Sequence, residues 1–164
     1  MRTRFIIRGA AGRKGVFMIP IQWKQNDKKT MHVNEAENGV VYLTWPAIEK
    51  IEGIRHAFST RIGGVSKEHL SSMNLSFSRG DPANVRENYR RFCEAAGFEG
   101  ENIVTSDQAH TTKVRYVTKA DCGSGVTRDR DFHDIDGMIT DEPGVVLATF
   151  YADCVPLYFV DPVH

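Results

Sequence analysis

The chain has 164 residues, of which 41% are hydrophobic and 26% charged, and its 21 basic and 21 acidic residues leave no net charge. This length allows one domain with a core of its own, and the composition is typical of a soluble globular protein. No apolar run approaches the ~18 residues of a membrane span, and the run from Phe5 to Ile7 is shorter than the ~7–15 apolar residues of a secretory signal. We therefore expect a cytoplasmic protein that contacts neither a membrane nor nucleic acid.

The N-terminal part of the chain, residues 1–38, is polar and basic and lacks periodicity. Its first 24 residues contain six basic residues and no acidic one. A basic segment without acidic residues is found in organelle transit peptides and in nucleic-acid-binding arms. Because Met18 and Met31 offer later start positions, we interpret residues 1–38 as a poorly ordered segment instead.

The first predicted strands flank a glycine turn. Residues 40–44 are β-branched and aromatic, and residues 54–60 alternate apolar and polar side chains, so each segment is expected to form a strand. Arg61 and the neighbouring Gly63 and Gly64 follow the second strand. A guanidinium beside glycine amides can hold a phosphate, but an ordinary turn with a positive-φ glycine is the simpler interpretation.

A single helix is predicted next, with clear signals at both ends. Asp81 suits the N-cap, Pro82 the first helical position, and Gly97 the C-terminal stop. The apolar side chains between them recur at helical spacing, and Cys93 lies on that stripe. We therefore expect Cys93 to pack in the core.

The second half of the chain is predicted to be rich in strands. These cover residues 103–105, 114–118, 137–140, 145–152 and 155–160, with a turn at residues 141–144. One helix among many strands predicts an α+β domain with mixed β-sheets and flanking helices.

The cysteines indicate a reducing compartment and one candidate site. Cys93, Cys122 and Cys154 are odd in number and widely spaced, which favours free thiols over a disulfide framework. Cys154 follows Asp153 inside an apolar run, where an ionised carboxylate is costly to bury. Cys154 could be a core thiol, a nucleophile with His110 as its base, or a metal ligand.

The six histidines differ in their expected roles. His110 follows the short strand at residues 103–105 and is either a loop residue or the partner of Cys154. His56 is expected to be structural, and His69 and His133 to lie at the surface.

Taken together, several motifs resemble those of the YfiH family, the laccase-domain proteins. The matching segments, in the family's order and spacing, are residues 58–66, 72–75, 80–82 with Val85 and Asn88, 108–110, 136–145 and 152–156. The likeness extends over about residues 54–162. One departure is Thr111, where the family usually has glycine directly after the ligand histidine.

The resemblance implies a fold and a metal site. The implied fold is a four-layer α/β/β/α arrangement, incomplete in this chain, with residues 39–164 forming the N-terminal part of a single catalytic domain. In the family, the His of Gln-x-His, the Cys of Ala-Asp-Cys and the His of a later Ala-His-Ala-Gly-Trp motif bind one zinc. His110 and Cys154 match the first two ligands. The third is expected beyond residue 164, so the chain is interpreted as an N-terminal fragment that is inactive alone.

The resemblance also implies a function. It is zinc-dependent purine nucleoside phosphorolysis, on adenosine, inosine or S-methyl-5′-thioadenosine, with a companion adenosine deaminase activity. The partners would be a purine nucleoside and phosphate, and the oligomeric state stays open. Cys154, His110 and Arg61 are the candidate catalytic residues, and the candidate substrate-binding residues are Arg61, Gly63, Gly64 and Asn74.

Three other functions remain open. A Cys–His set with copper in place of zinc would suit a polyphenol oxidase. A non-catalytic fragment or binding module is the second alternative. A hydrolase that uses Cys154 and His110 as nucleophile and base is the third.

Overall fold

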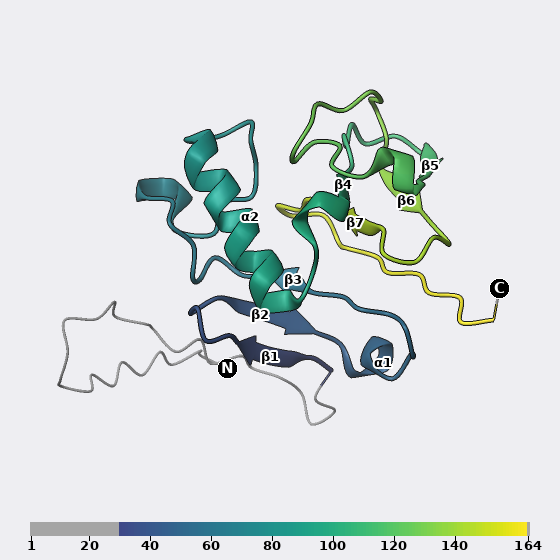
Figure 1. Cartoon of the computed structure of the whole chain (residues 1–164), viewed down its shortest axis with the longest axis horizontal. Coiled ribbons are helices and arrows are strands. Elements are labelled where there is room, and N and C mark those ends of the chain that lie inside the picture. Colours follow the sequence, from purple (N-terminus) through teal and green to yellow (C-terminus); the bar gives the residue numbers. More distant parts are fainter. Residues whose placement is uncertain (1–29, 164) are drawn as a thin grey trace.

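The computed structural model describes residues 30–163, which begin with an antiparallel sheet of β1 (His32–Glu35), β2 (Val41–Thr44) and β3 (Phe58–Ser59) (Figure 1). The expected strand at residues 40–44 is confirmed as β2, which is buried at all but one position. The strand expected over residues 54–60 is reduced to β3. After Thr44 the chain turns into α1 (Pro46–Glu49), and the backbone N–H of Trp45 donates to His56 Nε2 at 2.7 Å instead of to a strand.

The strand β1 lies within residues 1–38, the segment that was expected to be poorly ordered. Its residues pair with β2 throughout, from His32 opposite Thr44 to Glu35 opposite Val41. This edge strand is polar and largely exposed, so it lacks the apolar alternation by which strands are recognised. The remainder of the segment expected to be poorly ordered, residues 1–29, lies outside the described residues.

The long helix α2 (Pro82–Ala96) has the expected bounds. The Asp81 carboxylate accepts a hydrogen bond from the N–H of Ala83 at 2.8 Å, and Gly97 adopts φ 71° at the C-terminal end. Its apolar stripe packs in the core with Ile103. Cys93 is 5% exposed, and this burial raises the pKa of its thiol to about 11, so its expected packing role is confirmed.

A central pair of parallel strands, β4 (Ile103–Thr105) and β7 (Val146–Ala148), separates two cores. Ile103, Val146 and Ala148 face α2, whereas Val104 and Leu147 face the opposite core around Phe132. This alternation follows from the two-residue period of a strand. A second parallel pair, β5 (Val114–Tyr116) and β6 (Gly137–Ile139), lies beyond (Figure 1).

Three short 3₁₀ turns complete the elements, at Glu68–Leu70 (η1), Gly100–Asn102 (η2) and Lys119–Asp121 (η3). The α+β class is therefore confirmed. Within residues 30–163 one long helix covers the strands, so the second helical layer of the four-layer arrangement stays a prediction. None of the described helices is long and apolar enough to cross a membrane.

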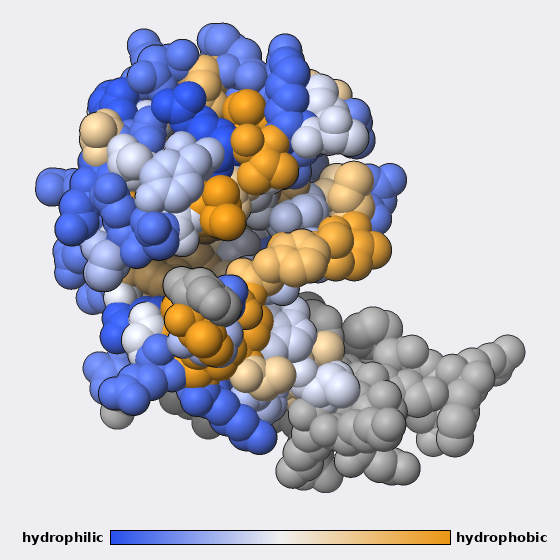
Figure 2. All heavy atoms as spheres, turned by 90° about the vertical axis from the view of Figure 1, so that its right-hand side faces the viewer, coloured by the Kyte–Doolittle hydropathy of each residue, from blue (hydrophilic) through white to orange (hydrophobic). Residues whose placement is uncertain are grey.

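The expected strand at residues 155–160 is absent, and the strand expected over residues 145–152 ends at Ala148. An extended run becomes a strand only by pairing, and no described strand pairs with this one. Most of its side chains are exposed, with Val155 at 77% and Phe159 at 88%. Figure 2 shows hydrophobic side chains on the face that carries this end of the chain. Within this run, Tyr158 packs against Trp45 with ring centroids 5.4 Å apart.

Candidate metal centre

Two loops at the same edge of the central strand pair form the candidate centre. His110 follows β4 and Cys154 follows β7. Because the two strands are parallel, the segments that follow them leave the sheet at the same edge, the carboxyl edge. This is the edge at which α/β proteins bind their ligands. His110 Nε2 and Cys154 Sγ lie 4.0 Å apart. The structure thus brings together the two residues that the sequence singled out.

Both side chains of this pair are exposed, which excludes the core-thiol interpretation of Cys154. Cys154 lies in a bend instead of a buried strand, and Asp153 beside it is exposed as well. The carboxylate therefore bears no burial cost that needs a partner. The nucleophile and metal-ligand interpretations remain.

The donor chemistry and the spacing fit a metal ion. A tetrahedral zinc with Zn–N of about 2.0–2.1 Å and Zn–S of about 2.3 Å places its nitrogen and sulfur ligands about 3.6 Å apart. The observed 4.0 Å is within a small loop movement of that value. Among residues 30–163, no group of three His, Cys, Asp or Glu side chains is placed to hold a metal.

The other histidines have their own contacts or surroundings. His133 Nδ1 lies 3.0 Å from Asp107 Oδ2, and this hydrogen bond lowers the pKa of Asp107. His56 is half-buried against Trp45, which agrees with the structural role expected of it, and desolvation lowers its pKa. His69 is exposed, as expected, in the 3₁₀ turn η1, and His164 lies outside the described residues.

The loop of His110 is held by the carboxylate of Asp136. Asp136 Oδ1 accepts the N–H of His110 at 2.9 Å, and Oδ2 accepts the N–H groups of Ala109 at 3.1 Å and Thr111 at 2.8 Å. Oδ2 also accepts the Thr111 hydroxyl at 3.0 Å. These bonds, led by that of the Thr111 N–H, lower the pKa of Asp136. His110 itself has φ 59°, the left-handed region that few side chains adopt.

A second side chain, Gln108, joins the two loops of the centre. Its Oε1 accepts the N–H of Phe150 at 2.7 Å, in the segment that leads to Cys154, and the Ser106 hydroxyl at 3.0 Å. The sequence singled out the motifs that contain Gln108 and Asp136 but gave neither residue a role. No local pattern could reveal the bond of Gln108 to Phe150 or the bonds of Asp136 to residues 109–111, because these partners lie 42 and 25 to 27 residues away.

The loop of Arg61 is explained by contacts within the protein. Arg61 Nε and Nη2 donate to the carbonyl oxygen of Ser71 at 2.9 and 2.8 Å, and Nη2 also donates to that of His69 at 2.7 Å. A Cβ on Gly63 would lie 2.4 Å from Val40 Cα, and one on Gly64 would lie 2.1 Å from a backbone oxygen. Phosphate binding by this loop stays a prediction.

Two asparagines hold the same region together. Asn74 Nδ2 donates to the carbonyl oxygen of Arg79 at 2.7 Å and thereby closes a turn, so its expected substrate contact also stays a prediction. Asn88, fully buried on α2, accepts the N–H of Val65 at 2.8 Å and donates to the carbonyl oxygens of Ser72 and Asn74 at 3.2 and 2.8 Å. Asn88 belongs to one of the segments that resemble the family, but the sequence predicted no role for it.

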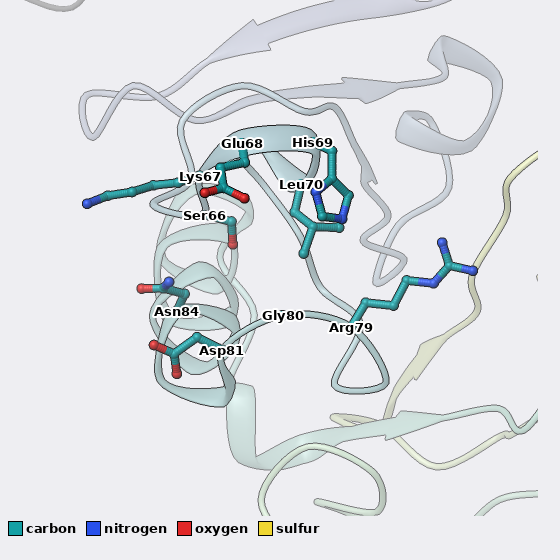
Figure 3. A pocket seen from close by; sticks show the side chains of 9 residues that line it. All are labelled: Ser66, Lys67, Glu68, His69, Leu70, Arg79, Gly80, Asp81 and Asn84. Carbon is teal, nitrogen blue, oxygen red and sulfur yellow. The ribbon is translucent and has the colours of Figure 1, made fainter.

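A cavity of about 300 Å³ lies beside this loop region (Figure 3). Ser66, Lys67, Glu68, His69, Leu70, Arg79, Gly80, Asp81 and Asn84 line it. Lys67 and Arg79 extend to opposite sides in Figure 3, so their charges do not converge on one point. The lining offers no focused anion site.

Comparisons with known proteins agree on one family. A family model described as multi-copper polyphenol oxidoreductase laccase matches residues 55–164. The chain is 41% identical over 109 residues to the purine nucleoside phosphorylase YlmD of Geobacillus stearothermophilus, and the match covers 63% of this chain and 39% of that protein. It is 38% identical over 112 residues to the purine nucleoside phosphorylase LACC1 of Mus musculus, covering 66% of this chain and 24% of that protein.

Solved structures give the same result. The crystal structure of YlmD from Geobacillus stearothermophilus matches with a TM-score of 0.64 and 38% identity, over 74% of this chain and 45% of that chain. The hypothetical protein YfiH of Bacillus licheniformis matches with a TM-score of 0.58 and 27% identity, over 78% of this chain and 43% of that chain. The chain thus spans less than half the length of the relatives it matches.

Proposed function

Because the chain belongs to the multi-copper polyphenol oxidoreductase laccase family, the YfiH-like proteins, we propose that it is part of a zinc-dependent purine nucleoside phosphorylase. The names of YlmD and LACC1 support the reaction class. The substrates we propose are adenosine, inosine and S-methyl-5′-thioadenosine, with adenosine deamination as a companion activity.

The observation that carries the proposal is the approach of His110 Nε2 and Cys154 Sγ to 4.0 Å. An imidazole and a thiolate are a donor pair that zinc takes in catalytic sites, where a third protein ligand leaves one position open. When bound, zinc would act as a Lewis acid and polarise an oxygen or nitrogen atom of the substrate. The roles of His110 and Cys154 are to hold the ion at the carboxyl edge of β4 and β7.

Phosphorolysis needs a phosphate oriented toward the ribose. A phosphate oxygen forms a bond to C1′, the glycosidic bond breaks, and its electron pair leaves with the base. Arg61 is the proposed phosphate contact, and its Nη1 is the guanidinium nitrogen that none of its described hydrogen bonds uses. Arg61→Ala should therefore reduce phosphorolysis more than deamination, because only phosphorolysis requires bound phosphate.

The test measures products with and without phosphate. The full product of the coding sequence should release adenine from adenosine only when phosphate is supplied, and should form some inosine in both cases. Chromatography separates the two products. Adenine release at equal rates in both conditions would contradict phosphorolysis and indicate hydrolysis.

Metal analysis separates the alternatives. We expect about one zinc for each chain in the colourless protein, and loss of the metal in Cys154→Ser. Intense visible absorption from a thiolate–copper bond would favour the polyphenol oxidase that the family's description names. Activity that survives complete metal removal would favour the Cys–His hydrolase.

Residues 1–164 alone are proposed to be inactive, because only two candidate ligands meet within residues 30–163. Zinc content and adenosine turnover of residues 1–164, measured beside the full product, test this. Equal turnover of the two would show that a residue of this chain completes the site.

A further inference from the structure

The Asp136 carboxylate occupies an unusual place in the candidate centre. Its described hydrogen bonds come from neither the imidazole nor the thiol: three consecutive backbone N–H groups and one hydroxyl donate to its two oxygens. Asp136 lies directly before β6, in the layer beyond the central strands. It therefore connects the loop of His110 to a separate structural element.

The backbone of residues 109–111, which carries the three N–H groups, has a conformation that needs support from the surrounding structure. His110 adopts φ 59°, which is unfavourable for a residue with a Cβ and persists only where the surroundings impose it. Thr111, directly after this histidine, adds a bond from its hydroxyl to Asp136 at 3.0 Å. The direction of the imidazole follows from this backbone conformation.

We propose that Asp136 is a positioning residue, which holds residues 109–111 in the turn that directs the His110 imidazole at Cys154 before a metal binds. The proposal deepens the function proposed above and rests on it. Partners behind the direct ligands commonly change metal affinity by 10–100-fold when they are removed. Here the partner acts through the backbone of the ligand instead of through its ring.

The substitution that tests this is Asp136→Asn, which preserves shape and removes one acceptor. Because Oδ1 and Oδ2 both accept N–H groups, either orientation of the amide places its NH₂ against at least one backbone N–H. The matched control is Asp134→Asn in the same loop. Asp134 is exposed, has φ 58°, which asparagine tolerates, and contacts Lys113 with its carboxylate at 3.7 Å.

Two measurements on the full product of the coding sequence give the result. Zinc affinity is measured by competition with a chelator, and the thiolate–cobalt charge-transfer band of the Co²⁺-substituted protein reports the ligand geometry. We expect Asp136→Asn to weaken zinc binding by about 10–100-fold and to shift or weaken the cobalt band. Asp134→Asn should stay within about twofold of the wild type.

A milder variant decides the case if Asp136→Asn does not fold. Thr111→Val removes one of the four donors and leaves the carboxylate in place, so a smaller loss with the same direction of spectral change is expected. Unchanged affinity and an unchanged cobalt band in Asp136→Asn, or in Thr111→Val if the first variant is unfolded, would overturn the proposal. An equal loss in Asp134→Asn would also overturn it, since the effect would then be one of charge alone.

Failure of the proposed function would look different. A wild-type protein that binds neither zinc nor cobalt would contradict the zinc-dependent function. The positioning role would then be decided in the metal-free protein by hydrogen exchange at the amides of residues 109–111. Protection that falls at least about tenfold in Asp136→Asn and persists in Asp134→Asn supports the role, and equal protection in all three proteins overturns it.

Discussion

The two halves of the described chain hold their loops with different chemistry. In the helix-bearing half, residues 30–102, neutral amides bind the backbone: Asn88 and Asn74 join the loops that flank α2. In the site-bearing half, residues 103–163, carboxylates accept most of these bonds, beside the amide of Gln108: Asp136 holds residues 109–111, and Asp121 accepts the N–H of Thr118 at 2.8 Å. An amide can both donate and accept and does not titrate, whereas a carboxylate binds N–H groups more strongly but depends on pH.

This difference matches the elements that each half contains. The helix α2 satisfies its own backbone over 15 residues, so its neighbours need only a few neutral contacts. The strands β4 to β7 have three residues each and satisfy few backbone groups by pairing. Charged side chains supply the missing partners for the loops between them. We therefore expect the two halves to respond differently to substitution and to acid.

The largest effect is expected where a buried amide is removed from the helix-bearing half. Asn88→Ala leaves the Val65 N–H and the Ser66 hydroxyl without their buried partner and should lower the free energy of unfolding by about 3 kcal/mol. Urea unfolding measures the change. Asn84→Ala, on the same helix but only partly buried, is the control and should change little. Equal costs for both would show that the amide contacts of Asn88 contribute nothing specific.

In the site-bearing half, Asp121→Asn should lower the free energy of unfolding by about 2 kcal/mol, because two charge-assisted contacts are weakened. Asp121 is 7% exposed, and its carboxylate pairs with Arg115 Nη2 at 2.7 Å and accepts the Thr118 N–H. The same urea experiment measures it, with the exposed Asp129→Asn as the control. If Asp121→Asn lowered the free energy of unfolding as little as the control does, a neutral amide could replace this carboxylate without loss of stability.

Acid should open the site-bearing half first. The Asp136 bonds to backbone N–H groups and the Asp107 bond to His133 lower the pKa of both carboxyls from the ordinary 3.8. The pKa of Asp121 is also lowered, because its hydrogen bonds outweigh the opposing effect of burial. A lowered pKa contributes stability that is complete above pH 3.8 and is lost as the pH falls through the folded value.

Hydrogen exchange between pH 6 and pH 2.5 distinguishes the halves. The amides of residues 103–148 should lose protection at higher pH than those of α2. Glu87 on α2 also has a lowered pKa, of about 2, but its partners Arg90 and Arg91 are surface residues of the same helix, where ion pairs contribute little. Earlier loss of protection in α2 would reverse the comparison.

The smallest effect should come from the contact of the His56 ring with the backbone of Trp45 in the helix-bearing half. The neutral His56 ring accepts the Trp45 N–H, and desolvation lowers its pKa from 6.5. Its contribution is therefore present above pH 6.5 and is lost as the pH falls through the folded value. His56→Gln can still accept this bond and should remove a pH dependence of less than about 1 kcal/mol between pH 7.5 and 5.5, measured by thermal unfolding. An unchanged pH dependence of thermal unfolding would show that titration of His56 does not affect the stability of this half.

How much could be predicted from the sequence depended on how local each signal is. The bounds of α2 were correct because Asp81, Pro82 and Gly97 act on the residues next to them. The strand expected at residues 155–160 was wrong because apolar, β-branched composition shows only that a segment could pair, and no described strand pairs with it. The strand β1 was missed for the opposite reason, since pairing with β2 makes a strand of a polar segment.

The candidate centre shows the same division. Motif spacing was sufficient to single out His110 and Cys154, because the chemistry of an imidazole and a thiol is a property of the residues themselves. Their approach to 4.0 Å depends on parallel pairing of β4 with β7, between segments about 40 residues apart. The roles of Asp136 and Asn88 arise only from such distant contacts, in which partners 14 to 27 residues away are brought within hydrogen-bonding distance. Local sequence thus determines the elements and the reactive groups, whereas folding decides which of them meet, because a hydrogen bond depends on distance in space and not on separation along the chain.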